Sequence, residues 1–347
     1  MRLAMICKAH TANARYRAIL PLRELQRRGH TVYFQGHASF GTLDAGGVPN
    51  WDLLHIQQLM GPGDLEIVQR LRANGIAVTW DTDDDITAAP KGSATYKELG
   101  RKRGMRKLWD QTVEMAQAAH LLTTTNEHLA NRYREAGVEH VQAIENYMGP
   151  EDVGRPRTRH QGLVIGLVAS DEHNEDLKRL QIAEVLGRLL QDHEGVRVIA
   201  LGLDLKLRDH RYLHKLKVPL DQLYELSRQF DIGLAPLVDS PMSRARSNVK
   251  LKEYAAAGAM WLASPIGPYT GMGEAQGGLL VAEDDWYPTL ESLLTDHARR
   301  LALTKRAQSW VRRQTIVQGG DRWEAAFRAA IVRARAASPT PKARPSA

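Results

Sequence analysis

Short apolar runs alternate with amphipathic segments along most of this 347-residue chain. In the first part of the chain, strands are predicted at Leu3–Cys7, Thr31–Phe34, Leu53–Gln57, Ala77–Trp80 and Leu121–Thr124. Helices are predicted between them at Arg17–Arg28, Asp64–Ala73, Met105–Ala118 and Glu127–Ala136. Strands that alternate with helices are typical of a doubly wound parallel sheet. We therefore expect an α/β protein.

The polar segment Asn146–Gln161 contains two prolines and interrupts the alternation, which indicates a hinge. After it, strands are predicted at Leu163–Val168, Val196–Leu201, Ile232–Pro236, Met260–Ser264 and Leu279–Val281. The helices predicted among them are Leu177–Asp192, Leu220–Phe230 and Asn248–Ala257. A chain of this length holds two domains of ordinary size. We place the first domain at residues 1–150 and the second at residues 151–315.

Two more helices are expected after these strands, and the second, Asp321–Ala337, is clearly amphipathic. Trp323, Phe327 and Ile331 repeat at helical spacing, with arginines on the opposite face. We expect residues 316–337 to cross back and pack on the first domain. The alternative is a helix that lies on a membrane surface, but an apolar face made mostly of alanine gives little insertion energy. Residues 338–347 are predicted to be a disordered tail.

The formal net charge of +7 is concentrated at the end of the chain. Residues 299–347 carry 12 basic and 2 acidic residues, so the first 298 residues have a net charge of −3. A nucleic-acid-binding domain spreads basic charge over a folded face, and this distribution argues against a nucleic-acid partner. A second basic run, Arg101–Lys107, has five basic residues in seven. It is typical of a solvated face, with contact to an anionic lipid surface as the alternative.

The sequence also predicts a compartment. Cys7 is the single cysteine, so an intrachain disulfide is excluded and a reducing environment is favoured. No apolar run reaches about 18 residues, the length that a spanning helix needs. The first residues are too charged for a signal peptide. We expect a cytoplasmic protein, with peripheral contact at the inner face of the plasma membrane as an extension of that expectation.

The segment Ser243–Ser264, SRARSNVKLKEYAAAGAMWLAS, carries the most chemistry. A polar and cationic loop is expected to open a helix that ends at Gly258, and an apolar strand follows. A helix N-terminus offers unpaired N–H groups and the positive end of a dipole, which favours anions. The side chains around that end suit a phosphorylated ligand: Arg246, Ser247, Asn248 and Lys250.

Glu253 followed by a small-residue turn, Gly258 and an apolar strand resembles the C-terminal half of GT-B glycosyltransferases of the family-4 type. The resemblance covers most of the chain and implies two Rossmann-like domains that face a central cleft. It implies transfer of a sugar from a nucleotide-diphosphate donor to a glycan or lipid-linked acceptor, as in polysaccharide biosynthesis. It further implies a retained anomeric configuration, no protein nucleophile, no metal and no cofactor besides the donor substrate.

The resemblance implies roles for the residues of this segment. Glu253 would accept hydrogen bonds from the ribose diol, and a solvated helix glutamate is the alternative. Arg246 and Lys250 would stabilise the diphosphate leaving group during catalysis. Ser247 and Asn248 would bind the donor, or would only cap the helix. Lys252 is expected to be solvated. The family usually carries a second glutamate eight residues before the first, and this chain has Ala245 there.

Acidic residues follow a predicted strand of the first domain. Asp81, Asp83, Asp84 and Asp85 come after the apolar run AVTW, where loops at the carboxyl ends of parallel strands line a binding site. A Mg²⁺ or Mn²⁺ site is one interpretation of this cluster. The resemblance favours Asp83 or Asp84 as catalytic-site contacts to donor or acceptor hydroxyls, with structural capping as the alternative.

Five further positions are candidates by their place in the fold that the resemblance implies. Arg15 and Arg17, after the first strand, would reach an anionic group, and His10 is a candidate general base. His173 would contact phosphate or sugar after the first strand of the second domain. Pro219 would lie where similar enzymes hold the base by backbone contacts.

Three rivals remain open at this point. One is a GT-B nucleotide-sugar epimerase or hydrolase, which would share the nucleotide site and need no acceptor. Another is a non-enzymatic protein that binds nucleotide-sugar or glycan. Ala245, in place of the usual glutamate, leaves this alternative open. The third, a nucleic-acid base glucosyltransferase, fits poorly with the acidic main body.

Overall fold

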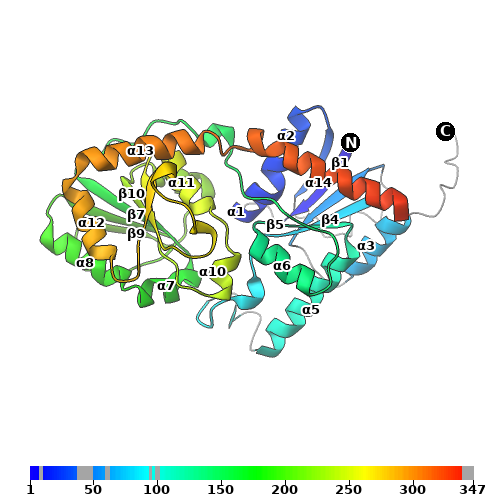
Figure 1. Ribbon diagram of the computed structural model, residues 1–347, viewed down its shortest axis with the longest axis horizontal. Coiled ribbons are helices and arrows are strands. Elements are labelled where there is room, and N and C mark those ends of the chain that lie inside the picture. The colour runs from blue at the N-terminus through cyan, green and yellow to red at the C-terminus, as the bar shows by residue number, and fades with distance from the viewer. Residues whose placement is uncertain (8–10, 37–49, 59–62, 94–95, 98–101, 338–347) are drawn as a thin grey trace. The chain divides into compact units, whose positions relative to one another are not determined.

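The computed structural model describes residues 1–7, 11–36, 50–58, 63–93, 96–97 and 102–337, and they form two compact units. Unit 1 comprises Met1–Asp84, Arg106–Asn146 and the chain from Gly319. Unit 2 comprises Asp85–Met105 and Tyr147–Gln318. Each unit has its own sheet with helices beside it (Figure 1). The tail predicted at residues 338–347 lies outside the described residues, as does His10.

Unit 1 is built on a six-stranded sheet in which every pair of neighbours is parallel. Its strands are β1 (Arg2–Cys7), β2 (Thr31–Gly36), β3 (Leu53–Gln57), β4 (Ala77–Thr82), β5 (Leu121–Thr124) and β6 (Val141–Ala143). Their order is β2-β1-β3-β4-β5-β6. The strand order therefore reverses between β1 and β3: β2 lies on one side of β1, and β3 and the later strands lie on the other.

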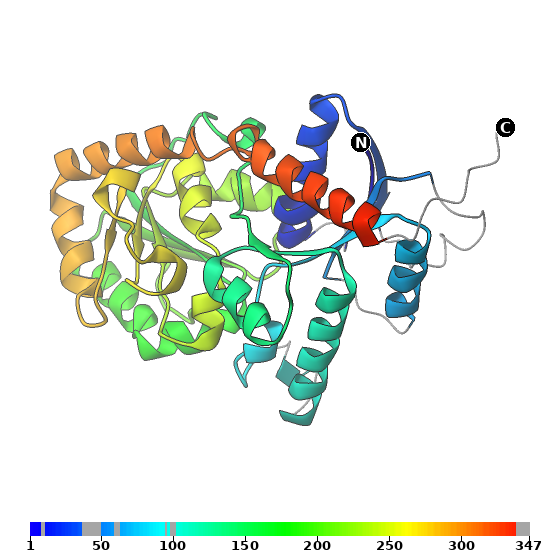
Figure 2. The same cartoon turned by 45° about the vertical axis from the view of Figure 1, so that its right-hand side comes forward.

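The helices of unit 1 follow the predicted alternation. They are α1 (Ala12–Ala14), the π-helical η1 (Arg15–Ile19), α2 (Leu20–Arg27), α3 (Asp64–Ala73), α5 (Lys102–Ala118, shared with unit 2), α6 (Glu127–Glu135) and α14 (Ile316–Ala337, in unit 1 from Gly319). The apolar face of α14 is buried, including Trp323 and Phe327. Arg28, just past α2, pairs with Asp321 and, at 3.5 Å, with Glu324 of α14. That apolar face is accordingly packed within unit 1 (Figure 2).

Unit 2 has a second six-stranded parallel sheet. Its strands are β7 (Leu163–Val168), β8 (Val196–Leu201), β9 (Tyr212–Lys215), β10 (Ile232–Ala235), β11 (Met260–Ala263) and β12 (Gly278–Leu280). The order is β12-β11-β10-β7-β8-β9, so this sheet reverses between β7 and β10. The α/β class with two Rossmann-like parallel sheets is confirmed.

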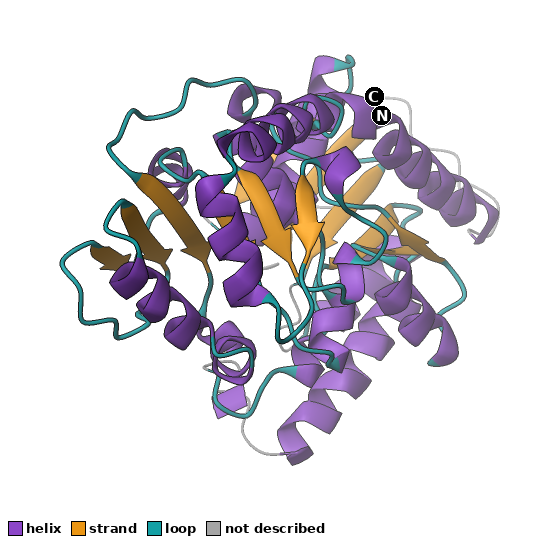
Figure 3. Ribbon diagram, turned by 60° about the vertical axis from the view of Figure 1, so that its left-hand side comes forward, coloured by secondary structure: helices purple, strands orange, loops and turns teal. Residues whose placement is uncertain are grey.

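Helices cover both faces of the second sheet (Figure 3). The α-helices of unit 2 are α7 (Asn174–Arg179), α8 (Ile182–Asp192), α9 (Leu220–Ser227), α10 (Pro241–Ala245), α11 (Val249–Ala257), α12 (Trp286–Thr295) and α13 (His297–Val311). Single turns of 3₁₀-helix are η3 (Ile86–Ala88), η4 (Pro150–Asp152), η5 (Asp171–His173), η6 (Gly267–Tyr269) and η7 (Glu274–Gln276). Leucines of α8 and α12 pack with alternate residues of β7, β8, β10 and β11 in one core.

Three predictions about these helices are wrong in detail. The helix predicted at Leu177–Asp192 is two helices, because Gln181 adopts a left-handed conformation with φ 50°. That turn allows Leu177, Leu180 and Ile182 all to enter the core. Three helices rather than two follow the last strand of unit 2. Ser243 and Arg244, predicted in a loop, belong to α10, whose N-cap Ser240 accepts a hydrogen bond from the Ser243 backbone N–H at 3.1 Å.

Candidate donor site

The candidate residues of unit 2 gather where its sheet reverses direction. The carboxyl ends of β7 and β10 lie side by side, with Leu167 paired to Leu234. In open α/β sheets, ligands bind outside the carboxyl ends of the strands at such a switch point. His173 follows β7, and Arg246, Lys250 and Glu253 follow β10. The topology therefore brings together residues that lie about 70 positions apart in sequence.

Tyr254 fixes α11 against the sheet and so sets the position of its neighbour Glu253. The Tyr254 ring is fully buried against Gly233 of β10, where a Cβ would lie 2.3 Å from the ring. Its hydroxyl donates to the Leu234 carbonyl at 2.8 Å and accepts from the Val168 N–H at 3.1 Å. The helix is thereby tied to both strands that flank the switch point.

Two cations and two carboxylates form a polar cluster at this place. Lys250 Nζ lies 3.0 Å from Glu253 Oε2. Arg246 Nη1 lies 3.1 Å from His173 Nε2, and Arg246 Nη2 lies 3.5 Å from Glu172 Oε2. We call Glu172, His173, Arg246, Lys250 and Glu253 the donor-site cluster. The structure thus brings together four of the residues that the sequence predicted and adds Glu172.

His173 is held in its neutral form. Burial lowers its pKa well below the usual value, and the positive charges of Arg246 and Lys250 lower it further. Its Nδ1 is buried and has no hydrogen-bond partner among the described residues. A buried ring nitrogen without a partner beside two cations is suited to a ligand that brings both hydrogen-bonding groups and negative charge.

Asn248 is the N-cap residue of α11, but its side chain does not cap the helix. The capping alternative is therefore wrong for Asn248. Its Oδ1 is buried without a partner among the described residues, while Nδ2 lies 4.0 Å from Met272 Sδ. Ser247 does contribute a weak cap, since its Oγ accepts from the Val249 N–H at 3.4 Å.

Lys252 is fully buried, so the prediction of a solvated side chain is wrong. Its Nζ lies 5.1 Å from the centre of the Tyr147 ring. A lysine ammonium over an aromatic face is attracted by the negative π-face of the ring. The partner lies more than a hundred positions earlier in the chain, and helical spacing therefore gave no sign of it.

Asp176 and Tyr269 both lie near Arg246 of the cluster, and the sequence had given no role to Asp176. Asp176 Oδ1 accepts from the Val238 N–H at 2.9 Å, which ties α7 to the chain after β10. Burial raises the pKa of Asp176 to about 6. Tyr269 of η6 is buried, and burial raises its pKa too, against the lowering effect of Arg246. The sequence signal that could have indicated a role for Asp176 is its place as an acidic residue in the first turn of the helix after β7.

A cavity of about 390 Å³ lies in unit 1 and another of about 530 Å³ in unit 2. The second is lined by Pro90, Gly92, Ser93, Asp171, Asn174, Glu175, Lys178 and Arg179. Several of these residues are sequence neighbours of His173, in η5 and the first turn of α7.

Pro219 is the exposed N-cap residue of α9. Within the described part of the chain, the Pro219 carbonyl accepts from the Leu223 N–H at 2.9 Å and makes no hydrogen bond with the cluster.

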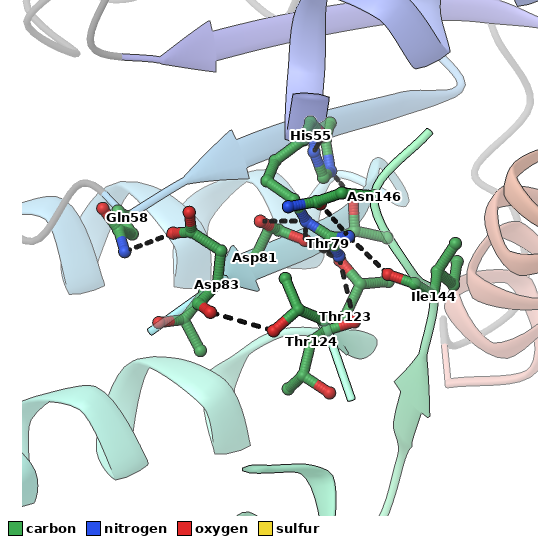
Figure 4. Close-up of polar contacts among 12 residues, drawn as sticks. His55, Gln58, Thr79, Asp81, Asp83, Thr123, Thr124, Ile144 and Asn146 are labelled. Atoms are coloured by element: carbon green, nitrogen blue, oxygen red, sulfur yellow. Dashed lines mark hydrogen bonds and ion pairs between the residues drawn. The ribbon is translucent and has the colours of Figure 1, made fainter. Parts of the chain in front are cut away.

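The acidic residues at the end of β4 and just after it have different roles. Asp81 is fully buried and accepts from Arg17 Nη2 at 2.7 Å and from Thr123 Oγ1 at 2.5 Å. Asp85 caps η3 by accepting from the Thr87 N–H at 3.1 Å. Both residues are therefore structural, and Figure 4 shows the Asp81 contacts.

Asp83 and Asp84 differ in their surroundings. Asp83 is buried, and Gln58 Nε2 donates to its Oδ1 at 2.6 Å (Figure 4). Burial raises the pKa of Asp83 well above its usual value, and the charges of Asp84 and Asp81 add to the effect. Asp84 is half-buried, and its carbonyl accepts from Thr82 Oγ1 at 3.2 Å. Asp83 therefore keeps its proton to a higher pH than an exposed aspartate does.

The prediction that Arg17 reaches a ligand is wrong. Its side chain is fully buried and donates to Asp81, to the Thr124 and Ile144 carbonyls and, at 3.1 Å, to Asn146 Oδ1. Its guanidinium carbon lies 4.9 Å from the centre of the Trp323 ring. Arg15, the first residue of η1, is half-buried.

The described residues hold neither a metal-binding cluster nor a membrane-spanning helix. No group of three or more His, Cys, Asp or Glu side chains there is arranged to hold a metal ion. Among the described helices, none is long and apolar enough to cross a membrane.

No protein-family model matches the sequence, and no curated protein matches it. Solved structures do match the fold. HepE from Anabaena, in a complex with UDP and glucose, has 12% sequence identity and a TM-score of 0.65 over 94% of this chain and 99% of its own. Sucrose-phosphate synthase from Thermosynechococcus elongatus has 11% identity and a TM-score of 0.68 over 94% and 98% of the two chains.

A trehalose-phosphate synthase from Burkholderia xenovorans matches 80% of this chain and 73% of its own, with 14% identity and a TM-score of 0.53. At such identities the likeness is one of fold. Together with the two parallel sheets, these matches show that the chain has the GT-B fold, as the resemblance of its Glu253 segment predicted.

Proposed function

We propose that this protein is a glycosyltransferase that uses a nucleotide-diphosphate sugar as its donor. The observation that carries the proposal is the donor-site cluster: two cations, a neutral histidine and two carboxylates lie together at the switch point of the unit 2 sheet. HepE, which shares the fold, has been crystallised with UDP and with UDP-glucose. A UDP-sugar is therefore the first donor to test.

Each member of the cluster has a role that its chemistry suits. Glu253 offers carboxylate oxygens to the hydroxyls of a ribose, which donate hydrogen bonds. Arg246 provides a planar fork of donors and Lys250 a point charge for the diphosphate. Neutral His173 can donate to a phosphate or sugar oxygen, and Ser247 and Asn248 add hydrogen-bonding groups beside them. Asp83 or Asp84 is proposed to contact hydroxyls of the donor or acceptor sugar.

The proposed reaction needs no covalent bond to the protein. The bond between the anomeric carbon and the diphosphate oxygen breaks, and the acceptor oxygen bonds to the same carbon. The acceptor proton passes to the departing diphosphate, on the face that the diphosphate leaves, so the anomeric configuration is retained. Negative charge develops on the diphosphate as it leaves, and Arg246 and Lys250 stabilise it more in the transition state than in the ground state. We assign that stabilisation to these side chains without a metal.

The acceptor class is part of the same proposal. We propose a glycan or a lipid-linked acceptor, used in the cytoplasm during polysaccharide biosynthesis. Arg106 and Lys107 are exposed on α5, which supports contact with an anionic lipid surface. A membrane contact through the apolar face of α14 has no such support, because that face is buried.

A second candidate is a non-enzymatic protein that binds nucleotide-sugar or glycan. Ala245 favours it, since this residue is buried in α10 where the family usually carries a glutamate. This candidate shares the nucleotide site and differs by the lack of turnover.

Turnover is tested by nucleotide release from a panel of nucleotide-sugars, with and without a mixture of glycan and lipid-linked acceptors. We expect release from one nucleotide class that depends on acceptor. Lys250→Ala should reduce kcat by about 10²- to 10³-fold, the usual effect of removing one transition-state donor. Lys305→Ala, an exposed lysine of α13, is the matched control and should leave the rate unchanged. Equal rates for Lys250→Ala and the control would overturn the assignment, and acceptor-independent release would favour a hydrolase.

A further inference from the structure

The cavity of unit 1 is polar and lies at the amino ends of β5 and β6. Its volume is about 390 Å³, within the range of small-molecule sites. It is lined by Arg72, Ala116, Gln117, Ala119, His120, Gly137, Val138, Glu139, His140, Arg333 and Ala337. His120 immediately precedes β5 and His140 immediately precedes β6. Asp81 and Asp83, in contrast, lie at the carboxyl ends of the same sheet, so this cavity is separate from the candidate residues of unit 1.

The cavity concentrates positive charge from different elements. Arg72 comes from α3 and Arg333 from α14. Neither guanidinium forms an ion pair with a carboxylate of the residues that the structure describes. Arg72 Nη1 donates to the Ala118 carbonyl, which holds this side chain at the end of α5. Arg333 Nη1 is buried with no hydrogen-bond partner among the described residues.

His120 adds a neutral donor between these charges. The Val78 N–H donates to His120 Nδ1 at 3.0 Å, so the neutral ring carries its proton on Nε2. The pKa of His120 is lowered to about 4, mainly by burial and then by the positive charges of Arg72, Arg333 and His140. The side chains of Arg72, Arg333 and His140 therefore all lie close enough to act on the His120 ring. One acidic residue, Glu139, lines the cavity, and it is exposed.

We propose that this cavity is a binding site for a phosphorylated small molecule, separate from the donor site. Two guanidinium groups present planar forks of N–H donors, the geometry that matches phosphate oxygens. The Nε2–H of His120 supplies a further donor, and the exposed His140 lies at the rim. The volume leaves room for an organic group beyond the phosphate. The proposal does not depend on the reaction at the donor site.

The test uses inorganic phosphate as the probe and hydrogen–deuterium exchange of the full chain as the readout. Phosphate is titrated at constant ionic strength against chloride, and exchange is followed in peptides that cover residues 115–121 and 136–141. The pocket variant is Arg72→Gln with Arg333→Gln. The matched control is Arg70→Gln with Arg335→Gln, which removes the same charge from exposed positions of the same two helices.

We expect phosphate to slow exchange in both peptides of the wild type and the control. The pocket variant should need about tenfold or more phosphate for the same protection, since each lost guanidinium removes charged hydrogen bonds. The single variants Arg72→Lys and Arg333→Lys keep the charge but lose the fork, and should bind severalfold more weakly. They serve as the test should the double variant fail to fold. Absence of protection in the wild type, equal protection in the pocket variant, or protection confined to peptides around residues 246–253 would each overturn the proposal.

Discussion

Arg17 and Asp81 form a fully buried ion pair in unit 1 at 2.7 Å. Their surroundings satisfy most of the remaining hydrogen-bonding groups: Thr123 donates to Asp81, and the Thr124 carbonyl and Asn146 accept from Arg17 (Figure 4). Such a pair adds little stability relative to apolar residues of similar size, but removing one partner leaves an uncompensated buried charge.

Asp81→Asn should therefore lower the free energy of unfolding by about 3–5 kcal/mol. The double variant Arg17→Met with Asp81→Asn should lose much less than the sum of the two single changes, because neither charge is then left alone. Urea unfolding of the four proteins measures this cycle. Additive losses would show that the pair does not act as a unit.

His120 makes the stability of the protein depend on pH. Its pKa is lowered to about 4 in the folded state, against about 6.5 in an unfolded chain. As the pH falls below 6.5, His120 becomes protonated in the unfolded state but stays neutral in the folded state. The free energy of unfolding therefore decreases between about pH 6.5 and pH 4.

His120→Gln should remove this loss, which amounts to up to about 3 kcal/mol by pH 4. Urea midpoints of both proteins at pH 7, 6, 5 and 4 measure it. We expect the stability of the wild type relative to the variant to fall steadily over this range. A constant difference between the two proteins would contradict the lowered pKa.

At the scale of elements, α11 ends at Gly258, which adopts a left-handed conformation with φ 87°. A Cβ there would lie 2.7 Å from Arg157 Cγ, and Arg157 pairs with Asp231 at 2.7 Å. Gly271 has nearly the same φ, 80°, but open space where a Cβ would lie.

Gly271→Ala should cost about 1–2 kcal/mol from the left-handed backbone alone. Gly258→Ala should cost more, since the Arg157 side chain must also move away from Asp231. Thermal or urea unfolding of the two variants separates the backbone effect from the contact. Equal losses would mean that Arg157 moves freely and that the contact does not constrain α11.

Strands were the elements that the sequence predicted best, and the reason is physical. Parallel strands covered on both faces are continuous apolar runs, so Leu53–Gln57 and Leu163–Val168 were predicted to the residue. The short strands β6 and β9 were not predicted from the sequence. Val141–Ala143 is only half-buried and Tyr212–Lys215 is mostly exposed, so neither shows a buried apolar run.

At the scale of the whole molecule, the alternation of elements and the Glu253 segment were enough to predict two parallel sheets and the GT-B fold. Lys250 and Glu253 were placed together by their spacing on one helix, whereas His173 was assigned to the site only through the resemblance. The contacts of Arg246 with His173, of Lys252 with Tyr147 and of Arg17 with Asp81 join residues from distant elements. The order of the strands in each sheet determines which of these residues come into contact, and the local sequence pattern does not predict it.

The central claim is that the donor-site cluster binds a nucleotide-diphosphate sugar. Titration calorimetry with UDP-, GDP-, ADP- and dTDP-sugars tests it most directly, using wild type, Glu253→Gln and the control Glu184→Gln, an exposed glutamate of α8. We predict that one nucleotide class binds to the wild type and the control, and severalfold more weakly to Glu253→Gln. Binding of no nucleotide, or equal affinity for all three proteins, would contradict the assignment of the donor site.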